Sequence, residues 1–307
     1  MSSSSPSILR LGLCCQFARE PIKFRTTTAT GLLKLARTER LRRLSELCFA
    51  NAEALLASLR YCAAHGIGAF RITSQILPIK THPEAGYAVT DLPDGAGISE
   101  AFRDGGAFAQ AHGIRLSFHP DQFVVLNSPN PVTLSHSLAE LDYQAEVAEW
   151  VGADTINLHG GGAYGDKPAA LRVLVQNIER LPATVRSRLT LENDDKVFTP
   201  RDLLPVCQAT QTPLVYDLHH HRCLADGLSV EEATERATAT WHGREPLFHL
   251  SSPLEGWDGP KPERHHDYID PSDFPAEWKG WALTVEVEAK AKELAVLKLL
   301  AHLRADG

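Results

Sequence analysis

Long apolar runs are missing from this sequence of 307 residues. No stretch approaches the roughly 18 apolar residues that span a bilayer, and residues 1–10 lack the apolar segment of a secretion signal. The six cysteines form no CxxC pair, which argues against a thiolate zinc site, and no spacing among them indicates a disulfide framework. We therefore expect a cytoplasmic protein with reduced thiols, and the sequence indicates neither a membrane partner nor an obligate protein partner.

Long runs of charge of one sign are also missing, except for one basic segment. With 43% apolar and 22% charged residues the chain has the composition of a globular protein, which excludes disorder and collagen. A net charge of −7 argues against binding of nucleic acid over the whole surface. Residues 19–43, however, hold eight Lys or Arg and only two acids. This segment is either a solvated helix face or a surface for an anionic ligand.

Short apolar runs recur along the chain, each followed by a polar turn and a longer segment with helical spacing. Such alternation is typical of an α/β protein, and a (β/α)8 barrel commonly takes about 250 residues as one unit. No clear linker interrupts the pattern, so we predict a single TIM-barrel domain over residues 1–307. The eight predicted strands are residues 10–15, 69–73, 115–119, 155–159, 189–193, 214–218, 247–251 and 283–288.

Helical segments between these strands carry recognisable signals. Leucines and a cysteine within residues 41–62 form one apolar stripe at helical spacing, which predicts a helix that packs on the core. The similar sequences AAHGI and QAHGI each end a helical segment, with Gly66 and Gly113 suited to a left-handed end position. His65 and His112 suit the negative end of a helix dipole, so we interpret both as structural.

Polar residues collect at the carboxyl ends of the predicted strands. In the last strand Leu283, Val285 and Val287 alternate with Thr284, Glu286 and Glu288, so the polar face is expected inside the barrel. Barrel enzymes build their sites at this end, and buried charges and imidazoles need partners. We therefore predict a metal site there. Its candidate ligands are His119, His159, Glu192, Asp217, the run His219 to His221, His249 and Glu288.

The donor set restricts the metal. Nitrogen and oxygen donors without thiolate favour Mn, Fe or Zn over Cu(I) or Fe–S, and over Mg, which prefers oxygen and water. One ion uses about three or four protein ligands, so this surplus predicts two or three ions. Neighbouring cations about 3.5 to 4 Å apart generate a hydroxide and stabilise both oxygens of an in-line displacement at phosphorus.

Nine motifs, in order along the chain, resemble those of the bacterial and fungal UV damage endonucleases, which are themselves similar to endonuclease IV. Each motif alone is weak, but nine in order over nearly the whole chain make chance similarity improbable. The motifs are LGLCCQF (residues 11–17) followed by FRT (24–26), FHPDQFVVLNS (118–128), NLHGG (157–161), LEND (191–194), YDLHHH (216–221), FHLSS (248–252), RHHDYI (264–269) and VEAKAKE (287–293).

The resemblance implies a metal-dependent DNA repair endonuclease. It would incise damaged double-stranded DNA 5′ to cyclobutane pyrimidine dimers and 6-4 photoproducts by a metal-activated hydroxide and leave a 3′-hydroxyl. The ions would be divalent, two or three in number, with Mn2+ the first choice and Zn2+, Co2+ or Mg2+ as alternatives. Catalytic roles would fall to Glu192, His119 and Glu288, with Glu192 between two ions. The implied ligands are His119, His159, Glu192, Asp217, His220, His249, His265 and Glu288.

The same resemblance implies residues that meet DNA. Gln122 and Phe123 occupy the positions whose side chains, in the family, insert into the DNA double helix beside a lesion. An aromatic ring inserted there would replace the lost base stacking, which is worth roughly 1 to 3 kcal/mol per base. The alternative is that Phe123 packs within its loop, since it begins the apolar run FVVL. Lys23 and Arg25, in the basic segment after the first strand, are expected to contact phosphates.

Three positions depart from the family pattern. Leu13 stands where many relatives carry an aromatic residue, and Phe17 stands near an asparagine position; both positions are credited with contacting the lesion. Leu247 occupies the place of a lysine that bridges metals in some relatives. We therefore expect that this chain recognises lesions differently from those relatives, and that it binds one of its metal ions more weakly or with different ligands.

Three alternatives stay open from the residues. A sugar isomerase or epimerase of the xylose-isomerase kind would use Glu192, Asp217, His249 and Glu288 and leave the other histidines unexplained. An activity at abasic sites would follow endonuclease IV. A lesion-binding scaffold would hold structural metals, which need closed sites rather than an open barrel mouth.

Overall fold

A single eight-stranded parallel sheet organises the chain in the computed structural model, which describes residues 9–305. The strand order β6-β5-β4-β3-β2-β1-β8-β7 curls into a nearly closed barrel, and a lone parallel bridge from Asp217 to His249 joins its two ends. The predicted range 1–307 and the segment 1–10 extend beyond the described residues. The strands are β1 (Leu9–Cys14), β2 (Ala69–Ile72), β3 (Arg115–Phe118), β4 (Thr155–His159), β5 (Leu189–Glu192), β6 (Leu214–Val215), β7 (Leu247–Leu250) and β8 (Leu283–Val287).

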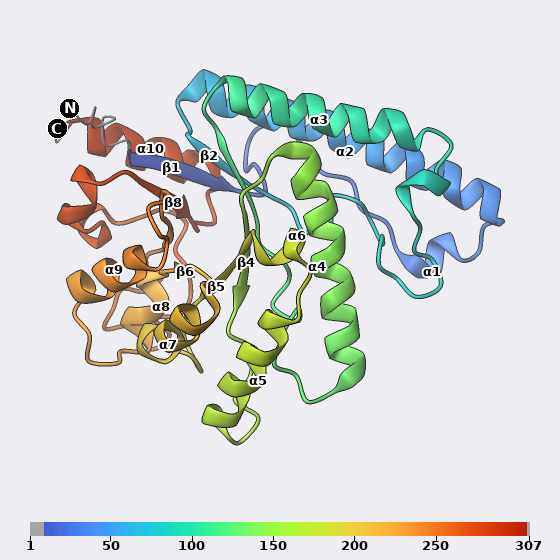
Figure 1. Cartoon of the computed structure of the whole chain (residues 1–307). Coiled ribbons are helices and arrows are strands. Elements are labelled where there is room, and N and C mark those ends of the chain that lie inside the picture. Colours follow the sequence, from blue (N-terminus) through green and yellow to red (C-terminus); the bar gives the residue numbers. More distant parts are fainter. Residues whose placement is uncertain (1–8, 306–307) are drawn as a thin grey trace, which may run out of the picture.

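Helices follow the strands and cover the outside of the barrel, with the long helices α2, α3 and α4 beside the first four strands (Figure 1). None of the helices in residues 9–305 has the length and apolar content needed to traverse a lipid bilayer. The α-helices are α1 (Ala29–Leu32), α2 (Arg37–His65), α3 (Gly95–Ala111), α4 (Pro131–Val151), α5 (Lys167–Glu179), α6 (Ala183–Arg186), α7 (Pro200–Thr210), α8 (Leu218–Cys223), α9 (Val230–Ala239) and α10 (Glu293–Ala305). The 3-10 turns are η1 (Val89–Asp91), η2 (Pro271–Asp273) and η3 (Ala276–Gly280).

The predicted (β/α)8 TIM barrel and all eight strand positions are confirmed. One boundary is wrong, because the sixth strand ends at Val215 rather than at residue 218. Asp217 instead accepts a hydrogen bond from the backbone N–H of His220 and so starts α8. A carboxylate that caps a helix N-terminus stops the strand before it.

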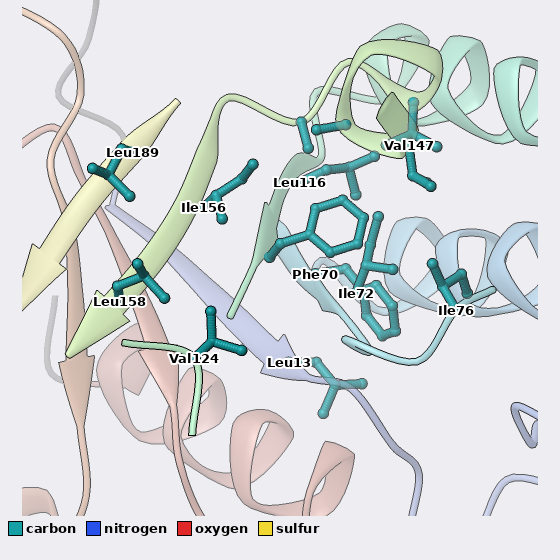
Figure 2. Close-up of a cluster of buried hydrophobic side chains, with 14 of the residues drawn as sticks. Leu13, Phe70, Ile72, Ile76, Leu116, Val124, Val147, Ile156, Leu158 and Leu189 are labelled. Carbon is teal, nitrogen blue, oxygen red and sulfur yellow. The ribbon is translucent and has the colours of Figure 1, made fainter. Parts of the chain in front are cut away.

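The apolar core lies between the outer face of the sheet and the helices. Leu13, Phe70 and Leu116, from three neighbouring strands, belong to one buried apolar cluster with Val147 of α4 (Figure 2). The opposite face of β8 carries Glu286, so the predicted alternation of apolar outside and polar inside holds. This alternation directs the charged side chains of the strands into the barrel axis.

The two repeated helix ends behave as predicted. Gly66 and Gly113 adopt φ angles of 73° and 64°, the left-handed region that suits glycine at a helix end. The rings of His65 and His112 hydrogen-bond to backbone carbonyls four residues earlier, at 2.8 and 2.9 Å. Both histidines therefore belong to the structure of the helix ends, as interpreted.

The basic segment 19–43 divides into two parts. Its first part is the loop between β1 and α1, at the carboxyl end of the strand. Its second part enters α2, where Arg42 pairs with Glu39 and Glu46 on the exposed face. The second part is therefore a solvated helix face, and the role of the first part as a surface for an anionic ligand stays a prediction.

Candidate metal centre

Glu192 lies at the centre of the barrel mouth and is 1% exposed. Its Oε2 is 2.9 Å from Nε2 of His119, and its Oε1 is 3.1 Å from Nδ1 of His249 and 3.4 Å from Nδ1 of His220. These side chains come from the ends of β5, β3 and β7 and from α8, which the parallel sheet brings to one edge. One carboxylate therefore faces three imidazoles from three directions.

Three groups of side chains have ligand atoms within 4.8 Å of one another, the spacing that could hold an ion. Two of the groups share Glu192 and the third joins the first through His249, so the three form one continuous cluster. Seven of the eight implied ligands belong to them. The groups are His119, Glu192 and His249; His159, Glu192 and His220; and Asp217, His249 and Glu288.

The electrostatics of the cluster favour cations. Burial alone would raise the pKa of Glu192, but the imidazoles of His249, His159 and His119 hold it well below the ordinary value. Burial would likewise raise the pKa of Glu288, which Arg71 and His249 instead keep well below its usual range. Both carboxylates are therefore ionised at neutral pH and present oxygen ligands.

Histidine protonation is divided within the cluster. Burial lowers the pKa of His159, so its imidazole is neutral and offers a free lone pair. Burial would also lower the pKa of His220, but Asp217 and Glu192 raise it to about 10. A metal ion would take the place of the proton that this imidazole otherwise holds between two carboxylates.

Three buried polar atoms of the cluster have no hydrogen-bond partner among the described residues: Nδ1 of His159, Oδ2 of Asp217 and Nε2 of His249. Buried polar atoms without partners cost free energy unless a ligand satisfies them. Nitrogen and carboxylate oxygen donors match Mn, Fe or Zn. The residues therefore fit a group of divalent ions.

The three consecutive histidines have different surroundings. His220 approaches Glu192 and Asp217, and its ring also lies 3.0 Å from the backbone oxygen of Asn193. His221 is held between Tyr216 and Asp226, at 2.8 and 3.0 Å. His219 is fully buried, away from Glu192, against the rings of Trp257 and His265. Of the three, only His220 has a ring nitrogen within 4 Å of a carboxylate of the cluster.

His265 lies at the edge of the cluster. Its Nδ1 is 3.8 Å from Glu288 and outside the three groups, while the ring of its neighbour His266 accepts a hydrogen bond from the backbone of Tyr268. Between the two histidines only His265 has a ring nitrogen within 4 Å of a carboxylate of the cluster, and its role as a ligand stays a prediction.

Sequence reasoning placed Glu286 and Asn157 on inward faces but missed Arg71 and the contacts that these side chains make behind the ligands. Arg71 Nη1 lies 2.7 Å from Glu288 and 3.4 Å from Glu286, and Glu286 is 3.2 Å from His249. Asn157 donates a hydrogen bond to Oε2 of Glu192. The signal available in the sequence was the inward position of Arg71 on β2, Glu286 on β8 and Asn157 on β4, since alternate residues of a strand face the barrel axis.

A cavity of about 1040 Å³ opens beside the cluster and reaches from His159 and His220 to Gln122 and Phe123. We name it the Phe123 cavity. Phe123 is 75% exposed, so it does not pack within its loop. Tyr164, 52% exposed, also lines the cavity and was not identified from the sequence. Two aromatic rings thus border one open space next to the cluster.

Lys23 and Arg25 are exposed on the loop after β1. Neither forms an ion pair with any residue between Leu9 and Ala305. The loop is fixed from beneath: Asn51 of α2 accepts from the backbone N–H of Arg25 and donates to its carbonyl. Glu293, fully buried at the start of α10, accepts hydrogen bonds from the backbone N–H groups of Ala18 and Arg19.

The three departures from the family pattern lie outside the cluster. Leu13 is fully buried in the core outside the sheet, and Phe17 packs against Tyr61 and Phe70. Leu247 is buried with Val215 and Trp241, one layer below His249. None of the three belongs to the three ligand groups.

A parallel (β/α)8 barrel with a carboxylate and imidazole cluster at the carboxyl ends of its strands is the architecture of a metal-dependent barrel enzyme. Residues 9–306 match the UV-endonuclease UvdE family. The UV DNA damage endonuclease of Deinococcus radiodurans is 37% identical over the full length of both chains. That of Bacillus cereus is 33% identical, over 92% of this chain and 89% of the relative. The chain therefore belongs to the UV-endonuclease UvdE family, as its motifs indicated.

Several solved structures resemble this chain in fold. SacUVDE superposes with a TM-score of 0.86 at 28% identity, over 97% of this chain and 99% of that one. Endonuclease IV from Thermus thermophilus gives a TM-score of 0.61 at 18% identity, over 96% and 98% of the two chains. A D-psicose 3-epimerase from Clostridium cellulolyticum gives 0.55 at 12% identity, over 82% of this chain and 91% of that chain. The last two likenesses concern the fold alone.

Proposed function

We propose that this chain is a metal-dependent endonuclease that incises damaged double-stranded DNA 5′ to UV photoproducts and leaves a 3′-hydroxyl. The observation that carries the proposal is the continuous cluster around Glu192 at an open barrel mouth, in a chain of the UvdE family. The exposed aromatic Phe123 and the exposed cations of the loop after β1 lie on the same side of the barrel, at the carboxyl ends of the strands.

The ions would be held by the eight residues His119, His159, Glu192, Asp217, His220, His249, His265 and Glu288. Divalent ions bound there supply an activated water and stabilise the charge that develops on the phosphate oxygens. We propose Mn2+ as the metal, with Zn2+, Co2+ or Mg2+ as substitutes.

The chain's own residues keep the ligands in place. Asn157 donates to Glu192 and thereby fixes the plane of this carboxylate. Asn193 holds Asp217 through two hydrogen bonds, one to its backbone N–H and one to its carbonyl, at 3.0 and 2.8 Å. Supporting contacts of this kind typically change metal affinity or activity by about 10 to 100-fold.

The experiment that tests the function is incision of an end-labelled duplex by the Mn2+-loaded protein. Three duplexes are compared: one with a single cyclobutane pyrimidine dimer, one with an abasic site and one undamaged. We expect a cut immediately 5′ of the dimer and an intact undamaged strand. Cutting at the abasic site alone would move the activity to that of endonuclease IV, and binding without any cutting would favour a lesion-binding scaffold.

Only the fold supports the alternative of a sugar isomerase or epimerase, because the D-psicose 3-epimerase shares 12% sequence identity with this chain. A native mass measurement of the metal content separates the two, because three ions favour the nuclease. Turnover of ketose sugars together with intact DNA would replace the proposal.

Replacing Phe123 by Ala is expected to weaken binding of the damaged duplex by about 5 to 150-fold, because one aromatic stacking contact is worth roughly 1 to 3 kcal/mol. Affinity for the undamaged duplex should barely change, since no base is displaced there. The measurement is fluorescence anisotropy with both duplexes. Val132→Ala is the matched control, because Val132 is 60% exposed on α4 and does not line the Phe123 cavity. Equal losses for both duplexes would contradict the stacking role.

Replacing Lys23 and Arg25 together by Gln is expected to flatten the salt dependence of DNA binding. Each phosphate contact contributes about −0.9 to the slope of log affinity against log salt, so the slope should become less steep by about 1.8. The measurement is the dissociation constant over a series of KCl concentrations. Arg42→Gln is the control, because Arg42 already pairs with Glu39 and Glu46. An unchanged slope would remove both residues from the DNA interface.

A further inference from the structure

Another cavity, of about 360 Å³, borders Glu288. Its walls include Arg71, Lys290 and Lys292, together with Glu288, His265 and Glu263. Glu288 and His265 belong to the implied ligand set, so this cavity borders the candidate metal centre directly. We name it the Lys290 cavity.

The cavity carries an excess of positive charge. Neither Lys290 nor Lys292 forms an ion pair with a carboxylate anywhere in residues 9–305. Glu263 is exposed at the rim, and Glu288 is already paired with Arg71 at 2.7 Å. Two ammonium groups thus remain without an anion in a space next to the cluster.

Arg71 adds a third cation to the walls of the cavity. Its side chain is 8% exposed, and its Nη1 lies 2.7 Å from Glu288. A guanidinium presents five N–H donors in a fixed fork, which suits the oxygens of a phosphate. The pair with Glu288 is made through Nη1 and leaves other donors of the guanidinium for an anion in the cavity.

The backbone holds the two lysines at a fixed place. Glu288 donates its N–H to the carbonyl of Leu250, and Lys290 donates to the carbonyl of His266, at 2.9 and 3.1 Å. The N–H of Lys292 closes a turn on the carbonyl of Ala289 at 3.1 Å. The lysines are therefore carried by the same short segment as the ligand Glu288.

We propose that the Lys290 cavity binds a backbone phosphate of the DNA strand that flanks the phosphate being cut. Arg71, Lys290 and Lys292 contact its oxygens, and this contact fixes the register of the strand on the metal centre. Phosphate contacts position a duplex without reading its sequence. The inference rests on the proposed function, because the occupant is the strand that the enzyme cuts.

The first test uses the full-length, Mn2+-loaded protein with Lys290 and Lys292 both replaced by Gln. We expect the salt slope of binding to a dimer-containing duplex to fall by about 0.9, the value for one phosphate. The dissociation constant and KM should rise about fivefold or more, while kcat stays within about twofold, because a bound strand still meets the intact cluster. Lys298→Gln is the control, since this exposed lysine lies over Tyr268 and lines a different cavity.

The second test identifies the phosphate. Neutral methylphosphonates replace single phosphates on either side of the incision site, and binding of the wild-type protein and the double variant is compared. We expect one position at which the replacement weakens wild-type binding and leaves the double variant unaffected. Equal losses at every position, or an unchanged salt slope in the variant, would overturn the subsite.

Two further readouts keep the outcome unambiguous. A wild-type protein that does not cut the damaged duplex contradicts the proposed function, whereas a variant that matches an active wild-type protein contradicts the subsite alone. Should the double variant unfold, Lys290→Gln by itself provides the same comparison, because Lys290 is exposed.

Discussion

Replacing Glu192 by Gln is expected to lower the incision rate by about 10³-fold or more, the scale of losing a principal contributor to transition-state charge stabilisation. Glu192 belongs to two of the three ligand groups, so the substitution disturbs both at once. Gln has nearly the same shape and can still hydrogen-bond to Asn157. The loss therefore comes from the missing charge rather than from a cavity.

DNA binding should survive the same substitution, because Glu192 is 1% exposed and lies beneath the open mouth. The measurement pairs single-turnover incision with anisotropy on the same duplex. Glu245→Gln is the control, since Glu245 pairs with Arg10 at the opposite end of the barrel. A Glu192→Gln protein that cuts at the wild-type rate would remove Glu192 from the metal centre.

Removal of the metal is expected to destabilise the protein as well as stop incision. Four carboxylates, those of Glu192, Asp217, Glu286 and Glu288, approach one another in the barrel, and the permanent cation near them is Arg71. Ions that bind only the folded chain stabilise it by about 4 kcal/mol when present at 1,000 times their dissociation constant. At roughly 2–4 °C per kcal/mol, the midpoint of thermal unfolding should fall on the order of 10 °C.

Scanning calorimetry with and without EDTA measures this difference, and added Mn2+ should restore both the midpoint and the activity. The Glu192→Gln variant should respond less to Mn2+ than the wild-type protein, because the ligand shared by two groups has lost its charge. Equal unfolding midpoints with and without chelator, together with undiminished incision, would contradict a metal requirement.

Two features of the sequence were sufficient to predict the barrel and the place of most candidate ligands. These are the alternation of apolar and polar residues along the strands and the polar residues at the carboxyl ends of the strands. Alternation placed His159 and Glu288 on the inner face, and a parallel sheet then brings their ends together. The choice among His219, His220 and His221 could not be derived this way. It depends on where α8 begins, since each helical step turns the side chain by roughly 100°.

The contacts that support the candidate ligands could not be predicted from the sequence, for a different reason. The contact between Arg71 and Glu288 joins residues 217 positions apart, and no local pattern specifies which inward side chains meet. Tyr164 is similar: its loop adopts a φ of 49°, which is uncommon for a residue other than glycine, and this conformation orients the ring. Such features follow from packing over the whole barrel.

The lone bridge between Asp217 and His249 ties the local stability of the barrel to its candidate metal centre. Every other neighbouring pair of strands is joined by at least two paired positions, but β6 and β7 are joined by a single bridge between two candidate ligands. Local opening of a protein costs least where few backbone hydrogen bonds must break. An ion bound to both Asp217 and His249 would therefore keep the barrel closed at the junction where its backbone is least strongly joined.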